Sequence, residues 1–205
     1  MNEFVQTLAG MDILEIAGLF FGIICVWLLI KENIWTWPTG IIYVIISLYI
    51  FYEEKLYADL ALHFLYLGIN FYGWYYWIFG NNDKKEDLPV TKASHNQLLI
   101  ILLISAVCIF LVGYLLQNFT DASLPYWDTT TTILSLAGMY LTARKKIENW
   151  YFWFVVDVIA TGIYYYKEIH FYAFLYLIYI GLAIVGYFSW RKSLRVSVAK
   201  FEQPF

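Results

Sequence analysis

"LLIILLISAVCIFLVGYLL" (residues 98–116) contains no charged residue, and it decides the fold class. A helix over this stretch would be about as long as the hydrocarbon core of a bilayer is thick, roughly 30 Å. Comparable apolar runs recur along the whole chain, which has 205 residues, of which 61% are hydrophobic, 21% aromatic and only 14% charged. The sequence therefore predicts an all-α integral membrane protein, anchored in lipid and without affinity for nucleic acid.

Charges and turn residues divide the chain into seven predicted transmembrane helices. Their expected bounds are Ile13–Ile30, Trp37–Tyr52, Ala58–Phe79, Leu98–Leu116, Trp127–Ala143, Trp150–Tyr166 and Phe171–Trp190. The N-terminal residues carry no basic segment before the first apolar run, so that run is predicted to be a mature span and not a signal peptide. Both cysteines, Cys25 and Cys108, lie inside apolar runs, which argues against a disulfide.

The basic residues predict how the chain is oriented. With seven spans, one side collects eleven of the 13 Lys and Arg residues, and the other side collects only Lys55 and Lys167. Cytoplasmic loops are enriched in Lys and Arg, so the crowded side is predicted to be cytoplasmic. The N-terminus is then expected outside and the C-terminus inside, in a multi-pass plasma membrane protein. The cytoplasmic set is Lys31, Lys84, Lys85, Lys92, Arg144, Lys145, Lys146, Arg191, Lys192, Arg195 and Lys200.

An internal repeat organises the spans. A shift of about 115 residues places Trp35 on Trp150, Glu53 on Glu168 and Tyr57 on Tyr172, and superimposes three spans on three spans. We therefore expect two parallel three-helix repeats joined by a connector helix, the 3+1+3 arrangement of SWEET transporters, with a substrate site near the midplane. The expected divisions are a first repeat (13–79), a polar cytoplasmic linker (80–97), the connector (98–117), a second repeat (127–190) and a cytoplasmic tail (191–205).

Polar residues at helical spacing give the candidate site. In the sixth span Trp153, Asp157, Thr161 and Tyr164 follow one face of a helix. The third span has a second such face, and the seventh span a row of tyrosines. Those residues are Asp59, His63, Tyr66 and Asn70 in the third span, and Tyr172, Tyr176 and Tyr179 in the seventh.

Asp157 is the most informative of these residues. A carboxylate near the bilayer midplane costs roughly 2.5–3.5 kcal/mol unless it is paired or hydrated. No span contains a Lys or Arg to pair with it. It could be protonated or bonded to a neighbouring helix, as polar groups between helices often are. Its stripe of Trp, Thr and Tyr favours a cavity, and the absence of bases disfavours phosphate. A flat, hydroxylated, unphosphorylated cargo that is neutral or cationic is expected.

The other polar residues carry less weight. For His63 and Asn70 a bond between helices is as good an interpretation as contact with substrate. The threonines at 129–132 are expected to bond to their own helix backbone and to have a structural role. The predicted substrate-binding set is therefore Trp153, Asp157, His63, Asn70, Thr161, Tyr164 and Tyr176.

Three segments resemble the PnuC-type nicotinamide riboside transporters. They are "WTWPTG" from residue 35, "KLYADLALHFLYLGINFYGWYYW" from residue 55 and "ENWYFWFVVDVIATGIYYYKEIHFYAFLYLIYIGLAIVGYFSWRKS" from residue 148. The resemblance implies a 3+1+3 fold, a homotrimer and facilitated diffusion of nicotinamide riboside. It further implies that Trp153 stacks on the nicotinamide ring and that Asp157 meets the ribose hydroxyls or the pyridinium charge. In the family's pattern the Asp157 position is often Asn and the His63 position often Gln.

Other functions remain as alternatives or are disfavoured by particular residues. A SWEET-like sugar facilitator shares the repeat but gives no reason for Asp157, and a proton-coupled carrier of another small vitamin could use Asp157 or Asp59. A retinal receptor would need a lysine in the seventh span, where there is none. The three histidines are scattered without metal-ligand spacing, so we expect neither an enzyme nor a cofactor or metal site.

Overall fold

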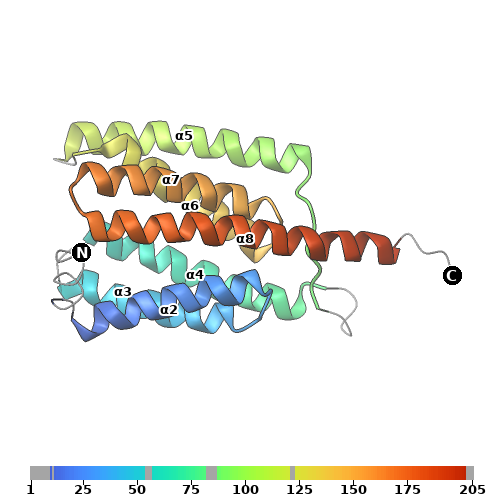
Figure 1. The fold of residues 1–205 in the computed structure, drawn as a ribbon. Coiled ribbons are helices and arrows are strands. Elements are labelled where there is room, and N and C mark those ends of the chain that lie inside the picture. Colours follow the sequence, from blue (N-terminus) through green and yellow to red (C-terminus); the bar gives the residue numbers. More distant parts are fainter. Residues whose placement is uncertain (1–9, 11, 54–56, 82–86, 121–122, 202–205) are drawn as a thin grey trace. The chain divides into compact units, whose positions relative to one another are not determined.

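The structure is a computed structural model of the chain (Figure 1). It describes residues 10, 12–53, 57–81, 87–120 and 123–201, apart from the side chains of residues 57–59, 61 and 197–201. Within these residues seven α-helices are present. They are α2 (Ile13–Ile30), α3 (Thr36–Glu53), α4 (Tyr57–Phe79), α5 (His95–Phe119), α6 (Pro125–Ala143), α7 (Asn149–Tyr166) and α8 (His170–Phe201). The all-helical class is confirmed.

The helices agree closely with the predicted spans, and the differences lie at their ends. α5 begins earlier than expected because Ser94 and Gln97 form a capping box at its N-terminus. α8 continues to Phe201, although residues 191–205 were assigned to a tail. No glycine or proline interrupts that segment before Pro204, so the helix has no reason to stop at Trp190. By length and composition α2, α5 and residues 170–196 of α8 are able to cross a membrane.

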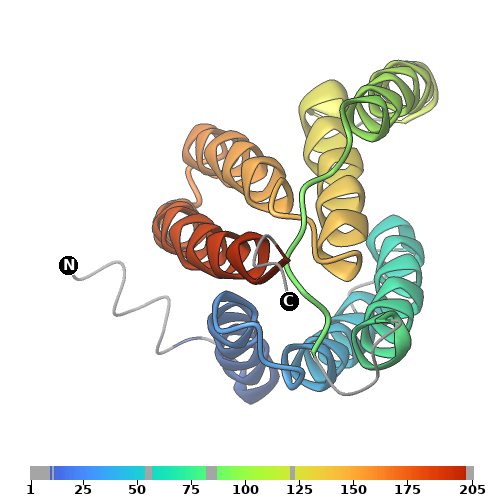
Figure 2. The ribbon, with the colours of Figure 1, turned by 90° about the vertical axis from the view of Figure 1, so that its right-hand side faces the viewer.

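The chain forms two compact units, and each is described separately. Unit 1 comprises residues 1–90, 143–145 and 188–205, and unit 2 comprises residues 91–142 and 146–187. In unit 1, α2 packs against α3 and α3 against α4 (Figures 1 and 2). In unit 2, α7 and the first part of α8 lie side by side, and α5 lies beside α6 (Figure 2). Gly113 of α5 faces the ring of Tyr126 of α6 so closely that a Cβ would overlap it.

The two loops that follow α2 and α6 share one backbone conformation. Glu32 and Lys145, which are 113 positions apart, have positive φ angles of 55° and 52°. The next residues, Asn33 and Lys146, each donate a backbone hydrogen bond of 2.9 Å to the residue five positions earlier. A left-handed residue followed by such a bond is a common way to end a helix. The same turn therefore ends the first helix of each predicted repeat. It also ends α7, where Glu168 has a φ angle of 60° and Ile169 donates to the Tyr164 backbone oxygen over 2.9 Å.

After each loop, the ring of a tryptophan on one helix packs against a glycine of another helix; we call this contact a crossing of tryptophan on glycine. In unit 1 the ring of Trp37 (α3) lies against the backbone of Gly73 (α4). In unit 2 the ring of Trp150 (α7) lies against Gly186 (α8). These pairs are again 113 positions apart. The offset of 115 residues predicted from the sequence is therefore wrong by two residues. Because 21% of the chain is aromatic, matches between aromatic residues accumulate at several neighbouring offsets.

The polar linker is partly buried. Leu88 is 9% exposed and Val90 only 1% exposed. Thr91 pairs with Lys146 in an isolated parallel bridge, and the backbone N–H of Ala93 donates to the Glu148 carboxylate over 2.8 Å. The end of the linker is therefore fixed to the loop between α6 and α7. Residues 82–86 lie outside the described part of the chain.

Candidate substrate-binding site

Asp157 lies on α7 of unit 2, with only 6% of the residue exposed. Among the described residues of that unit, its carboxylate has neither a hydrogen bond nor an ion pair. Lys167, the basic residue that follows the C-terminal end of α7, lies 3.4 Å from the Asp128 carboxylate of α6. The acid is therefore buried, and it has no basic partner among the described residues of its unit.

Trp153 lies one turn before Asp157 and is held by α6. Its indole N–H donates to the Thr142 hydroxyl over 3.2 Å, and this hydroxyl donates in turn to the backbone oxygen of Gly138 over 2.9 Å. A Cβ at Gly138 would lie 3.3 Å from the indole, so the glycine allows the ring to approach α6. The indole is thus fixed by a chain of hydrogen bonds, which leaves its ring, and not its N–H, for contact with a substrate.

Thr161 bonds within its own helix. Its hydroxyl donates to the backbone oxygen of Asp157 over 2.7 Å. Thr129, Thr130 and Thr131 make the same kind of bond within α6, which confirms the bonds to their own helix that were predicted for these three. Thr161 therefore keeps only acceptor capacity for a ligand, and its place in the predicted site is weaker than that of Asp157.

The tyrosines of α7 and α8 form a stack. Tyr164 lies 5.3 Å from Tyr176 at an interplanar angle of 14°, and 5.4 Å from Tyr172 at 26°. Tyr179 meets the edge of Tyr176 at 5.9 Å. The structure therefore brings together the two predicted residues Tyr164 and Tyr176. Tyr164 follows Asp157 by about two helical turns, or roughly 10 Å, so the stack forms a layer of its own along α7.

His63 and Asn70 occupy the interior of unit 1. His63 is 8% exposed and meets the rings of Phe51 at 4.7 Å and Tyr66 at 5.2 Å, both edge to face. Asn70 is 4% exposed, and its amide donates to the backbone oxygen of Tyr66 over 2.9 Å. Its Oδ1 would lie 2.6 Å from a Cβ at Gly40 of α3. Asn70 thus fills the contact between α3 and α4. The side chain of Asp59 lies outside the described residues.

The aromatic groups of the two units occupy equivalent positions. At the offset of 113 residues, Phe51, His63 and Tyr66 correspond to Tyr164, Tyr176 and Tyr179. Each set is in edge-to-face or stacked contact within its own unit. His63 and Tyr176, chosen separately from the sequence, are therefore counterparts. Thr142, which orients Trp153, was missed because its contact depends on the turn between α6 and α7 and leaves no periodic signal.

Comparison with known proteins assigns the family. A sequence model described as "Nicotinamide mononucleotide transporter" matches residues 12–192. The chain belongs to this family. The family consists of membrane transporters, and the resemblance noted in the sequence is confirmed.

Named relatives and a solved structure agree with this assignment. The nicotinamide riboside transporter PnuC of Escherichia coli K12 is 25% identical, over 89% of this chain and 86% of its own. The riboflavin/roseoflavin transporter RibM of Streptomyces davaonensis is 26% identical, over 86% of this chain and 83% of its own. The crystal structure of the vitamin B3 transporter PnuC superimposes with a TM-score of 0.69 at 23% identity, covering 89% of this chain and 82% of that one. The last match supports the helical fold.

Proposed function

We propose that the chain transports nicotinamide riboside across a bacterial inner membrane by facilitated diffusion. The observation that carries the proposal is Asp157, a buried carboxylate without a basic partner in its unit, one turn from an indole ring fixed by Thr142. Nicotinamide riboside is a flat pyridinium cation that bears a ribose and no phosphate. An aromatic face and a carboxylate complement such a cation, whereas hydroxyl and amide groups suit its sugar.

The names of the family and of the relatives give three candidate cargoes, which are nicotinamide mononucleotide, riboflavin and nicotinamide riboside. The side chains in the predicted spans favour one of them. A mononucleotide carries a phosphate, which usually requires Arg, Lys or a helix N-terminus, and the predicted spans contain no basic residue. Riboflavin is a larger, uncharged ring system that gains nothing from a carboxylate. The riboside is the one of the three with a positive ring and no phosphate. Asp157 therefore favours the riboside.

Particular residues are assigned roles within this proposal. Trp153 stacks on the nicotinamide ring, and Asp157 meets the pyridinium charge or the ribose hydroxyls. Tyr164 and Tyr176 supply a second aromatic layer. In the first repeat His63, at the position that corresponds to Tyr176, supplies the equivalent ring. Asn70 and Thr161 bond mainly to their own helices, so we assign them supporting contacts at most.

The proposed architecture is the 3+1+3 arrangement, with repeats at 13–79 and 127–190 and α5 as connector. The two matched contacts of tryptophan with glycine, both at an offset of 113 residues, support it. We further propose that the protein is a homotrimer, with the N-terminus outside and the C-terminus cytoplasmic. The distribution of basic residues supports this orientation.

Two other transport functions make different predictions. A sugar facilitator would show competition by glucose and indifference to the charge at residue 157. A proton-coupled carrier would require an ion gradient for uptake. The test is uptake of labelled nicotinamide riboside by purified protein in liposomes, with glucose, thiamine, riboflavin and nicotinamide mononucleotide as competitors. Saturable riboside uptake without a gradient supports the proposal, and competition by glucose alone would overturn it.

A further inference from the structure

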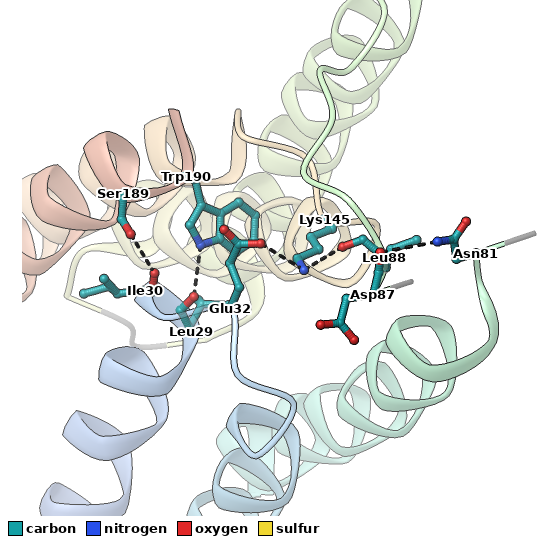
Figure 3. A network of polar contacts seen from close by, with 9 residues as sticks. All are labelled: Leu29, Ile30, Glu32, Asn81, Asp87, Leu88, Lys145, Ser189 and Trp190. Atoms are coloured by element: carbon teal, nitrogen blue, oxygen red, sulfur yellow. Dashed lines mark hydrogen bonds and ion pairs between the residues drawn. The ribbon is translucent and has the colours of Figure 1, made fainter. Parts of the chain in front are cut away.

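Lys145 is a buried cation with several partners in unit 1. Its ammonium group donates to the Leu88 backbone oxygen over 2.6 Å and lies 3.0 Å from the Glu32 carboxylate (Figure 3). It also lies 4.6 Å from the centre of the Trp77 ring. Only 3% of Lys145 is exposed. Glu32 follows α2, Trp77 lies near the end of α4 and Leu88 lies in the linker. Lys145 therefore joins the end of α6 to three other segments of unit 1.

α8 contacts the C-terminal end of α2 through Ser189 and Trp190, which lie well inside α8. The indole N–H of Trp190 donates to the Leu29 backbone oxygen, and the Ser189 hydroxyl donates to the Ile30 backbone oxygen, each over 3.0 Å (Figure 3). Trp190 is fully buried, and its ring centre lies 6.1 Å from that of Trp77. The C-terminal ends of α2 and α4, the loop after α6 and residues 189–190 of α8 are thus connected by one layer of contacts.

Two of these contacts join residues at equivalent positions of the repeats. Glu32 and Lys145 are 113 positions apart, and so are Trp77 and Trp190. When two repeats are related by a twofold axis, a residue touches its own counterpart only close to that axis. Both pairs lie within unit 1, so a twofold axis that relates the two predicted repeats would pass close to them. The flanking residues Lys31, Arg144 and Arg191 belong to the basic side, which is expected to be cytoplasmic.

We propose that Glu32–Lys145 and Trp77–Trp190 form the cytoplasmic gate of the transporter, in its closed state. The proposal rests on the proposed transport function, since carriers built of two repeats work by moving one repeat against the other around a fixed site. Release of cargo into the cytoplasm then requires the contacts on the axis at that face to separate. A permanent anchor is the competing interpretation of the same contacts.

Reversible cross-linking separates a gate from an anchor. The test variant carries Ile30→Cys and Ser189→Cys, because the Ser189 hydroxyl lies 3.0 Å from the Ile30 backbone oxygen and the two positions are near enough for a disulfide. Cys25→Ser and Cys108→Ser remove the native thiols. In liposomes, the reduced form takes up labelled nicotinamide riboside. Oxidation to the disulfide reduces uptake to that of protein-free liposomes, dithiothreitol restores it, and riboside binding measured by calorimetry persists in the oxidised form. Uptake that continues unchanged in the fully oxidised protein would show an anchor, and failure of the disulfide to form would show that the positions do not meet.

A matched pair within one repeat is the control. Cys25 Sγ lies 3.6 Å from the Thr36 hydroxyl oxygen, so Thr36→Cys with Cys108→Ser offers a disulfide inside the first repeat. Its oxidation leaves uptake unchanged, because the gate is free to open. The gate variant leaves Glu32 and Lys145 in place, so its reduced form keeps the ion pair. Absence of riboside uptake by the unmodified protein would contradict the proposed function, whereas uptake by the oxidised gate variant would contradict the gate alone.

Discussion

The matched crossings of tryptophan on glycine allow one prediction to be worked out fully. Gly73→Ala places a methyl group inside the ring of Trp37, and Gly186→Ala places one inside the ring of Trp150. Neither ring has room to move away, because Trp37 is 3% exposed and Trp150 is 2% exposed. Trp37 is also held edge to face against Trp77 at 5.4 Å. The helices must therefore separate to accommodate each methyl group.

The expected cost follows from overpacking. Forcing an extra methyl group into a packed core costs typically about 1–3 kcal/mol. Replacing a helical glycine with alanine returns roughly 0.8–1 kcal/mol in helix propensity. The net loss is about 1–2 kcal/mol when the clash lies in the upper part of its range. For a chain of this size each kcal/mol lowers the melting temperature by about 2–4 °C.

The same helices provide matched controls. Gly68 of α4 and Gly181 of α8 have no atom within 4 Å of a Cβ, so Gly68→Ala and Gly181→Ala keep the gain in propensity without a clash. Thermal unfolding of the four variants in detergent, followed by tryptophan fluorescence, gives the comparison. The crossing variants melt below the parent, and the controls melt at or above it. Equal melting temperatures for all four would refute the close approach of the helices.

Three further variants test the site and the gate. Asp157→Asn keeps the size of the side chain but removes its charge. Because a hydrogen bond to a charged group contributes about 1.5–3 kcal/mol, we expect riboside binding, measured by calorimetry, to weaken about tenfold or more. Unchanged affinity in this folded variant would make Asp157 a structural residue. Thr142→Val leaves the buried Trp153 N–H without its acceptor, which costs about 1–3 kcal/mol of stability. The variant also raises the KM for riboside, because the indole loses its fixed orientation. An unaltered KM would argue against a role of Thr142 in orienting Trp153. Lys145→Met removes the partner of Glu32. We expect the free energy of unfolding to fall by about 3 kcal/mol, which is the lower end of the range for breaking a buried ion pair, because the Glu32 side chain is still 21% exposed. Adding Glu32→Gln should recover part of that loss, and no recovery would contradict the pairing.

The helices were predictable because their signals are local. Long apolar runs bounded by charges located α2 and α5, and a capping box that can be read in the sequence, Ser94 to Gln97, accounts for the earlier start of α5. The burial of Asp157 followed from its place in an apolar helix. The contact of Tyr164 with Tyr176 followed from two rows of aromatic residues on consecutive helices.

Contacts between distant segments were not predictable in the same way. From the sequence, Lys145 is interpreted only as one of the basic residues of the cytoplasmic side, since nothing in a single sequence pairs it with Glu32, 113 positions earlier. The offset of the repeat was wrong by two residues because abundant aromatic residues matched at a neighbouring register, whereas the two contacts of tryptophan with glycine favour 113. The burial of Val90, which is 1% exposed, was likewise not predictable from the polar composition of the linker around it.

Uptake by liposomes tests the central claim most directly. Purified protein is reconstituted without an ion gradient and supplied with labelled nicotinamide riboside, alone or with excess nicotinamide mononucleotide, riboflavin or glucose. The account predicts saturable uptake that unlabelled riboside abolishes and that the other three compounds leave nearly unchanged. Uptake of riboflavin or glucose in place of the riboside, or riboside uptake no faster than in protein-free liposomes, would contradict it.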